Sequence, residues 1–131
     1  MPVEMPAVRI LIVDDDRAIC DYMQTLLERD GYEVKALGDP LAVEEEVRTG
    51  GYHLIILDLM MPDVDGFEVV SKLKEDAAAS QIPILIYTAK NITSEDRERL
   101  QGNIQSIIQK GDFGKDRFLE MINNLQTSQA A

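Results

Sequence analysis

Val8-Arg9-Ile10-Leu11-Ile12-Val13 is a nearly continuous apolar run that ends in Asp14-Asp15-Asp16, and Leu54-Ile55-Ile56-Leu57 is a second run that ends in Asp58. Runs of this length and polarity are typical of strands that are covered on both faces in a parallel sheet. Both end abruptly in carboxylates. The sequence therefore predicts two central strands with acidic groups at their carboxyl ends.

Around these runs, further strands alternate with amphipathic helical stretches. Strands are expected at Tyr32–Leu37, Ile84–Tyr87 and Ile104–Ile108. The intervening helices are expected from Ile19 to Gly31, from Asp39-Pro40 to Gly50-Gly51, over Gly66–Glu75, from Thr93 to Gly102, and over Lys115–Leu125. This alternation implies right-handed crossovers and one α/β domain, a doubly wound parallel sheet with helices on both faces.

Several local patterns set the helix faces and ends. The first helix has one apolar stripe, made of Ile19, Tyr22, Met23, Leu26 and Leu27, with Cys20 as a packing residue at its edge. We expect Asp16 to cap this helix and Gly31 to end it, whereas Asp39 and Pro40 have the N-cap and N1 pattern. Thr93-Ser94-Glu95-Asp96 resembles a capping segment for a short polar helix. In the last helix, the inward face is Phe118, Met121, Ile122 and Leu125.

Composition restricts the partners. The 131 residues carry a net charge of -11, with a pI near 4.4, which disfavours direct binding to nucleic acid or to an anionic membrane surface. A single cysteine excludes an intramolecular disulfide and fits the cytoplasm. Residues 1–7 lack the features of a signal peptide, and we expect residues 1–7 and 126–131 to be flexible ends of a domain spanning residues 8–125.

Polar groups follow each central strand. Asp14 and Asp15 follow the first, Asp58 the third, Thr88 the fourth and Lys110 the fifth. In a parallel sheet these ends point the same way, so the five side chains can converge. Clustered carboxylates repel one another, and a hard cation such as Mg²⁺ relieves that repulsion. With a hydroxyl and a lysine added, the set fits phosphoryl transfer onto Asp58.

The motifs that carry these groups resemble the receiver domain of two-component response regulators. They are Ile10-Leu11-Ile12-Val13-Asp14-Asp15-Asp16, Leu57-Asp58-Leu59-Met60-Met61-Pro62-Asp63-Val64-Asp65-Gly66, Tyr87-Thr88-Ala89 and Lys110. The resemblance covers residues 8–125. It implies a flavodoxin-like fold with five strands in the order 2-1-3-4-5 and five helices.

The resemblance also implies a role for each site residue. Asp58 accepts a phosphoryl group from a histidine kinase or a histidine phosphotransfer protein. Magnesium is held by Asp14, Asp15, Asp58 and the backbone carbonyl of Met60, while the phosphoryl oxygens are bound by Thr88 and the backbone amide of Ala89. Lys110 pairs with Asp58 or its phosphate. Pro62 and Gly66 shape the loop after Asp58. Output then passes through contact with a downstream protein.

Two positions depart from the family pattern. Gly111 follows Lys110 where the family has proline, so we expect a trans peptide bond and a rearranged loop there. Ile107 stands where the family has an aromatic residue that moves with the threonine, and its side chain cannot make that ring motion; how the readout is altered is left open. Lys90 borders the site, and its role is left open between tuning the phosphate lifetime and simple solvation.

The sequence fits two other functions less well. A magnesium-dependent phosphohydrolase needs Asp-x-Asp at the nucleophile; Asp58-Leu59-Met60 lacks it, and Asp63-Val64-Asp65 follows Met61-Pro62 rather than a strand. A receiver that signals without phosphorylation is disfavoured by the complete acidic set. The chain is thus expected to catalyse only its own phosphorylation and dephosphorylation. Whether it stands alone or belongs to a longer kinase is left open.

Overall fold

A five-stranded parallel sheet forms the centre of the molecule in the computed structural model, which describes residues 8–39, 42–61, 64–77, 79–104, 106–109, 119–120 and 122–123. Its strands are β1 (Arg9–Val13), β2 (Glu33–Leu37), β3 (Leu54–Leu57), β6 (Ile84–Thr88) and β7 (Ser106–Gln109). They lie in the order β2-β1-β3-β6-β7, all parallel. This confirms the predicted order and places β2 at an edge.

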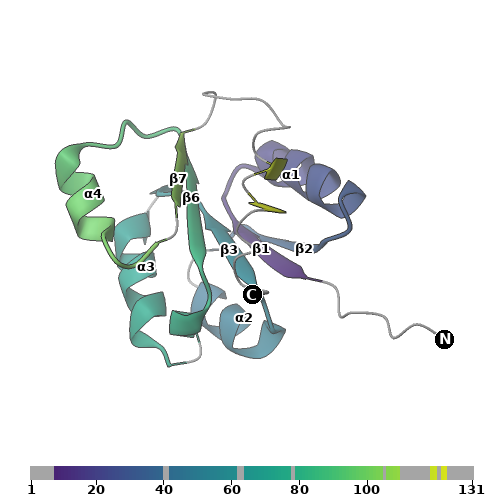
Figure 1. The fold of residues 1–131 in the computed structure, drawn as a ribbon, viewed down its shortest axis with the longest axis horizontal. Helices are drawn as coiled ribbons and strands as arrows, with labels where there is room; N and C mark the ends of the chain where they lie inside the picture. Colours follow the sequence, from purple (N-terminus) through teal and green to yellow (C-terminus); the bar gives the residue numbers. More distant parts are fainter. Residues whose placement is uncertain are drawn as a thin grey trace.

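Helices cover both faces of this sheet (Figure 1). On one face, α2 (Val43–Gly50), α3 (Gly66–Glu75) and α4 (Ser94–Leu100) pack on alternate strand residues that include Leu11 and Ile55. On the other face, α1 (Arg17–Arg29) packs on the intervening residues, such as Ile12 and Ile56. Because the central strands are buried on both faces, their sequences are continuously apolar.

Helix α1 has the predicted ends but a different face. The side chain of Asp16 accepts hydrogen bonds from the amides of Ala18 and Ile19, and Gly31 has a positive φ of 96° just beyond the helix. Cys20 is buried, as predicted. Tyr22, by contrast, is 55% exposed, so its assignment to the buried stripe is wrong. The buried face of α1 consists of Cys20, Met23, Leu26 and Leu27.

Helix α2 begins later than predicted. It starts at Val43 with Ala42 at the N-cap position and no side-chain cap, whereas Asp39 had been expected to cap it. The Ala42 amide donates to the Asp39 carbonyl, an i to i+3 bond that closes a tight turn and not an α-helical ring. Pro40 lies outside the described residues.

Helices α3 and α4 agree closely with the sequence. Helix α3 has the predicted bounds and buries the predicted residues Phe67, Val70 and Leu73. At α4, Thr93 and Asp96 form a reciprocal capping box, as their spacing predicts. In the part of the chain that the structure describes, no helix is long and apolar enough to span a bilayer.

The last predicted helix is described at four residues. Leu119, Glu120, Ile122 and Asn123 are helical, and Ile122 is fully buried beside α1. Phe118, Met121 and Leu125 lie outside the described residues. An unpredicted element follows Asp58: β4 (Met60–Met61) and β5 (Val64–Asp65) pair antiparallel as a short two-stranded ladder.

Candidate functional site

Three carboxylates meet at the carboxyl edge of the sheet. Asp14 follows β1 and is 2% exposed, Asp58 follows β3 and is 5% exposed, and Asp15 is exposed beside them. Each offers an oxygen, and these oxygens all lie within 4.8 Å of one another. The structure therefore brings together the three aspartates that the sequence singles out.

The sheet itself positions these side chains. The amide of Asp58 donates to the carbonyl of Val13, which extends the pairing of β1 and β3 by one residue. The amide of Asp14 likewise donates to the carbonyl of Leu37 on β2. Both aspartates are thus fixed by backbone bonds to neighbouring strands, and their orientation does not depend on a flexible loop.

Local amides also stabilise the two buried carboxylates. Oδ1 of Asp14 accepts from the amide of Asp16 at 2.9 Å, and Oδ1 of Asp58 accepts from the amide of Met60 at 3.0 Å. The thiol of Cys20 donates to the carbonyl of Asp14 at 3.3 Å. Hydrogen bonds to the charged form lower the cost of burying a carboxylate.

The carboxylate cluster fits a divalent cation. Magnesium prefers oxygen ligands at about 2.0–2.1 Å, so ligand oxygens on opposite sides of the ion lie roughly 4.2 Å apart. The separations among the oxygens of Asp14, Asp15 and Asp58 are compatible with that requirement. The donor set consists of three carboxylates, and such an all-oxygen set suits a hard cation and not a soft one.

Thr88 lies at the end of β6, on the other side of β3 from Asp14. It is fully buried, and its Oγ1 accepts a hydrogen bond from the amide of Lys90 at 3.3 Å. Strand β6 pairs directly with β3, with Ile86 opposite Leu57. This pairing places Thr88 at the same edge of the sheet as Asp58.

Of the remaining predicted site residues, some lie outside the described part of the chain and others lie at the border of the site. Lys110 and Gly111 lie outside the described residues, as do Pro62 and Asp63. Ala89 is exposed in a bend directly after β6, and Met60 is 54% exposed at the border of the site. The predicted roles of the Ala89 amide and the Met60 carbonyl remain predictions.

Gly66 begins α3 against the backbone that follows Asp58. A Cβ built on it would lie 2.6 Å from the Cα of Leu59 and 2.9 Å from its carbonyl oxygen. Only glycine fits so close to another backbone segment. Gly66 therefore lets α3 approach the residue next to Asp58, in agreement with its predicted influence on this loop.

Asp65 does not join the acidic cluster. Its Oδ1 accepts from the amide of Phe67, which caps α3, and its Oδ2 pairs with Arg99 at 3.4 Å. Asp65, the second aspartate of the Asp-x-Asp spacing, is thus the N-cap residue of α3. Asp65 therefore does not serve as the second aspartate, the acid/base, that a phosphohydrolase would need beside Asp58.

Lys90 has a partner that the sequence did not reveal. Its ammonium forms an ion pair with Asp96 at 2.7 Å, so it is not simply a solvated loop lysine. Gln109 at the end of β7 donates to the Lys90 carbonyl. The capping pattern around Thr93 was the only sequence signal that Asp96 faces inward, and nothing in it indicated Lys90.

Comparisons with known proteins agree on one family. The response regulator receiver domain matches residues 10–123. Over 116 residues the chain is 40% identical to the DNA-binding dual master transcriptional regulator RpaA of Synechocystis sp. (strain ATCC 27184 / PCC 6803 / Kazusa), a match covering 85% of this chain and 42% of that protein. It is 37% identical over 89 residues to the response regulator MprA of Mycobacterium ulcerans (strain Agy99), covering 68% of this chain and 38% of the relative. The chain therefore spans less than half the length of these curated relatives.

Solved structures show the same fold. The chain resembles the response regulator receiver domain protein (CheY-like) of Methanospirillum hungatei JF-1 with a TM-score of 0.84 and 25% identity. This match covers 95% of the chain and 98% of that structure, so the likeness extends over a whole domain.

Proposed function

Because the chain belongs to the family of response regulator receiver domains, we propose that it is a signalling switch in which Asp58 accepts a phosphoryl group. The observation that carries the proposal is the cluster of Asp14, Asp15 and Asp58, whose oxygens lie within 4.8 Å of one another. Thr88 ends the neighbouring strand at the same edge. These positions support the proposal, in which Asp58 is the nucleophile, the three carboxylates hold the cation and the Thr88 hydroxyl contacts the phosphoryl group.

The proposed reaction transfers the phosphoryl group from a phosphohistidine of a kinase or phosphotransfer protein. A carboxylate oxygen of Asp58 attacks phosphorus, the P–N bond breaks with its electron pair going to the imidazole, and an acyl phosphate forms. Magnesium held by Asp14, Asp15, Asp58 and the Met60 carbonyl would neutralise the charge that gathers on the phosphoryl oxygens.

The remaining site residues are proposed to hold the product. The Thr88 hydroxyl and the Ala89 amide donate to phosphoryl oxygens, and Lys110 pairs with the phosphorylated Asp58. These contacts would stabilise the phosphorylated form and couple it to the surrounding backbone. By this proposal the chain catalyses only its own phosphorylation and dephosphorylation.

We propose that the output is contact with a downstream protein, in the cytoplasm. The net charge of -11 disfavours direct contact of this segment with nucleic acid. The DNA binding named for RpaA is a property of that protein, which is more than twice as long as the matched segment. Nothing in the match assigns DNA binding to residues 10–123.

Intact-mass measurement tests the proposal directly. The protein is incubated with Mg²⁺ and a small acyl-phosphate donor, and we expect a single phosphate adduct. Asp58→Asn should remove the adduct, because an amide is a poor nucleophile. Asp16→Asn is the matched control: it also removes one carboxylate next to the site, yet asparagine still caps α1, so the adduct should remain. An adduct of unchanged yield in Asp58→Asn would exclude Asp58 as the acceptor.

A further inference from the structure

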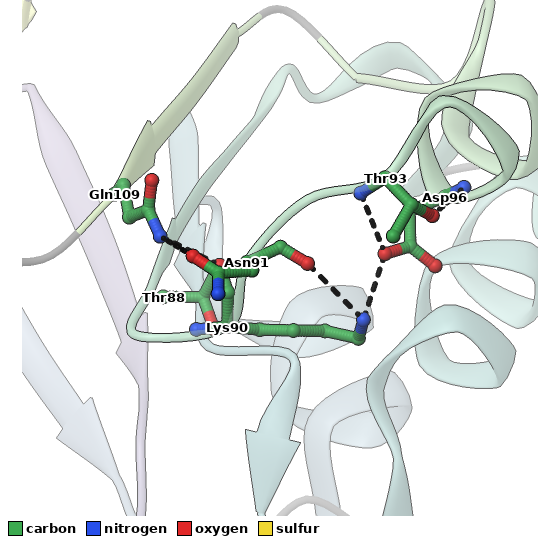
Figure 2. A network of polar contacts seen from close by, with 6 residues as sticks. All are labelled: Thr88, Lys90, Asn91, Thr93, Asp96 and Gln109. Atoms are coloured by element: carbon green, nitrogen blue, oxygen red, sulfur yellow. Dashed lines mark hydrogen bonds and ion pairs between the residues drawn. The ribbon is translucent and has the colours of Figure 1, made fainter.

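A polar network joins the end of β6 to the start of α4 (Figure 2). The backbone amide of Lys90 donates to Oγ1 of Thr88 at 3.3 Å, while its ammonium donates to Oδ2 of Asp96 at 2.7 Å. Lys90 therefore contacts the threonine of the site through its backbone and helix α4 through its side chain.

The helix end of this network is tightly organised. Oδ2 of Asp96 also accepts from the amide of Thr93, and the amide of Asp96 donates to the Thr93 hydroxyl. The Asp96 side chain is 11% exposed and that of Lys90 33%. The hydrogen bond from Lys90, followed by the one from the Thr93 amide, lowers the pKa of Asp96. Lys90 thus contacts the carboxylate that completes the capping box of α4.

Strand β7 holds the same loop from its other side. Nε2 of Gln109 donates to the carbonyl of Lys90 at 3.2 Å and to Oδ1 of Asn91 at 2.9 Å. Gln109 is the strand partner of Thr88 in the sheet. The loop after β6 is therefore bonded to Thr88, α4 and β7 together.

The aromatic side chain that the family has at this strand position is replaced here by Ile107, which is apolar. It is half-buried on β7 and packs against the core on the α2, α3 and α4 face. Its side chain has no hydroxyl and no ring that could exchange an inward for an outward position as Thr88 moves. Among the described polar contacts of the loop after β6, those of Lys90 connect Thr88 with Asp96 on α4.

We propose that Lys90 is a positioning residue that transmits the displacement of Thr88 to the capping box of α4. When the Thr88 hydroxyl turns to a phosphoryl oxygen on Asp58, the Lys90 amide follows Oγ1 or loses its bond. Either event moves the backbone from which the ammonium reaches Asp96. This inference rests on the proposed phosphorylation of Asp58 and adds the route by which α4 responds to it.

Amide NMR spectra with beryllofluoride and Mg²⁺, which mimic the phosphoryl group, test the route. In wild type we expect shifts at Asp58 and Leu59 and also through α4. In Lys90→Met, the shifts at Asp58 and Leu59 should persist, while those of α4 fall to less than half. Asp96→Asn should give the same loss, since it removes the same ion pair from the helix side. Lys90→Arg should restore the α4 shifts.

Lys74→Met is the matched control. Lys74 also hydrogen-bonds backbone carbonyls, those of Ser80 and Ile82, but it lies at the opposite end of β6. Its replacement should leave the α4 response unchanged. Undiminished α4 shifts in Lys90→Met would overturn the relay. Loss of the shifts at Asp58 would also overturn it, because Lys90 would then hold the phosphoryl group itself. Absence of any shift in wild type would refute the proposed function, and the relay with it.

Discussion

Asp14 and Asp58 show how a single residue type serves two purposes at the end of a strand. Each is almost fully buried, each accepts a hydrogen bond from a nearby amide, and each lies within reach of the exposed Asp15. A buried carboxylate without such bonds would destabilise the fold. The same two carboxylates thus combine burial, a local amide hydrogen bond and a place in the acidic cluster.

Gly66→Ala tests the closest backbone contact of the site. The new Cβ would lie 2.6 Å from the Cα of Leu59, so α3 or the segment after Asp58 must shift. We expect a loss of about 1–3 kcal/mol in the free energy of unfolding, measured by denaturant titration.

Gly38→Ala is the control for this substitution. A Cβ at Gly38 meets nothing within 4 Å, and its φ is not positive, so stability should stay within about 0.5 kcal/mol of wild type. Yields of the phosphate adduct should fall in Gly66→Ala and not in Gly38→Ala. Equal stability of the two variants would contradict the steric account of Gly66.

At the scale of elements, polar side chains tie the edge strand to its neighbours. Glu46 on α2 accepts from Lys35 on β2 at 2.9 Å and from the hydroxyl of Tyr52, just before β3, at 2.7 Å. Arg9 of β1 lies over the Tyr52 ring, 4.8 Å from its centre. Glu46 thus connects α2 with two segments of the sheet.

This connection predicts a pH dependence. Burial, followed by the hydrogen bond to Glu46, raises the pKa of Tyr52 to about 12. A tyrosine in the unfolded chain has a pKa of about 10. The raised pKa of Tyr52 therefore stabilises the folded state fully below pH ~10, and this contribution is lost as the pH rises through the folded-state pKa.

Tyr52→Phe removes the titrating group and supplies the measurement. The difference in unfolding free energy between wild type and Tyr52→Phe should shrink as pH rises from about 9 to about 12, because only wild type carries this linkage. The absorbance titration of the variant should also lack the tyrosinate step near pH 12. A difference that is constant over this range would show that Tyr52 is not stabilised as its contacts indicate.

At the scale of the whole molecule, the net charge is -11, and three of the acidic side chains lie together at one site. The folded chain holds Asp14, Asp15 and Asp58 together, whereas unfolding separates them. A cation that binds the cluster therefore stabilises the folded state. Mg²⁺ should raise the free energy of unfolding by about 1.4 kcal/mol when its free concentration is ten times Kd.

Asp15→Asn and Asp21→Asn separate site binding from general screening. Both remove one exposed carboxylate, but only Asp15 belongs to the cluster. Thermal unfolding at matched ionic strength should show the Mg²⁺ effect lost in Asp15→Asn and retained in Asp21→Asn. An equal response of the two variants would mean that Mg²⁺ only screens the acidic surface.

Local patterns determined most of the fold. Apolar runs such as Leu54–Leu57 predicted the central strands, and Thr93 with Asp96 predicted a capping box, because the covalent spacing of these residues already specifies the contacts. Family resemblance added the strand order, which the topology confirms. The errors lay where several groups compete for one place: Tyr22 is exposed although it fits the helical stripe, and α2 begins at Val43 although Asp39 and Pro40 have the pattern of a helix start.

The sequence by itself determined which residues could form the site, since Asp14, Asp58 and Thr88 each follow an apolar run that had to be a buried strand. Only the tertiary structure decided how Lys90 connects that site to α4. Its partners are Thr88, Asp96 and Gln109, and which of them a long flexible lysine reaches depends on the path of a loop. Strand ends are placed by periodic backbone bonding that the sequence encodes locally, whereas a side-chain ion pair depends on the packing of elements from different parts of the chain.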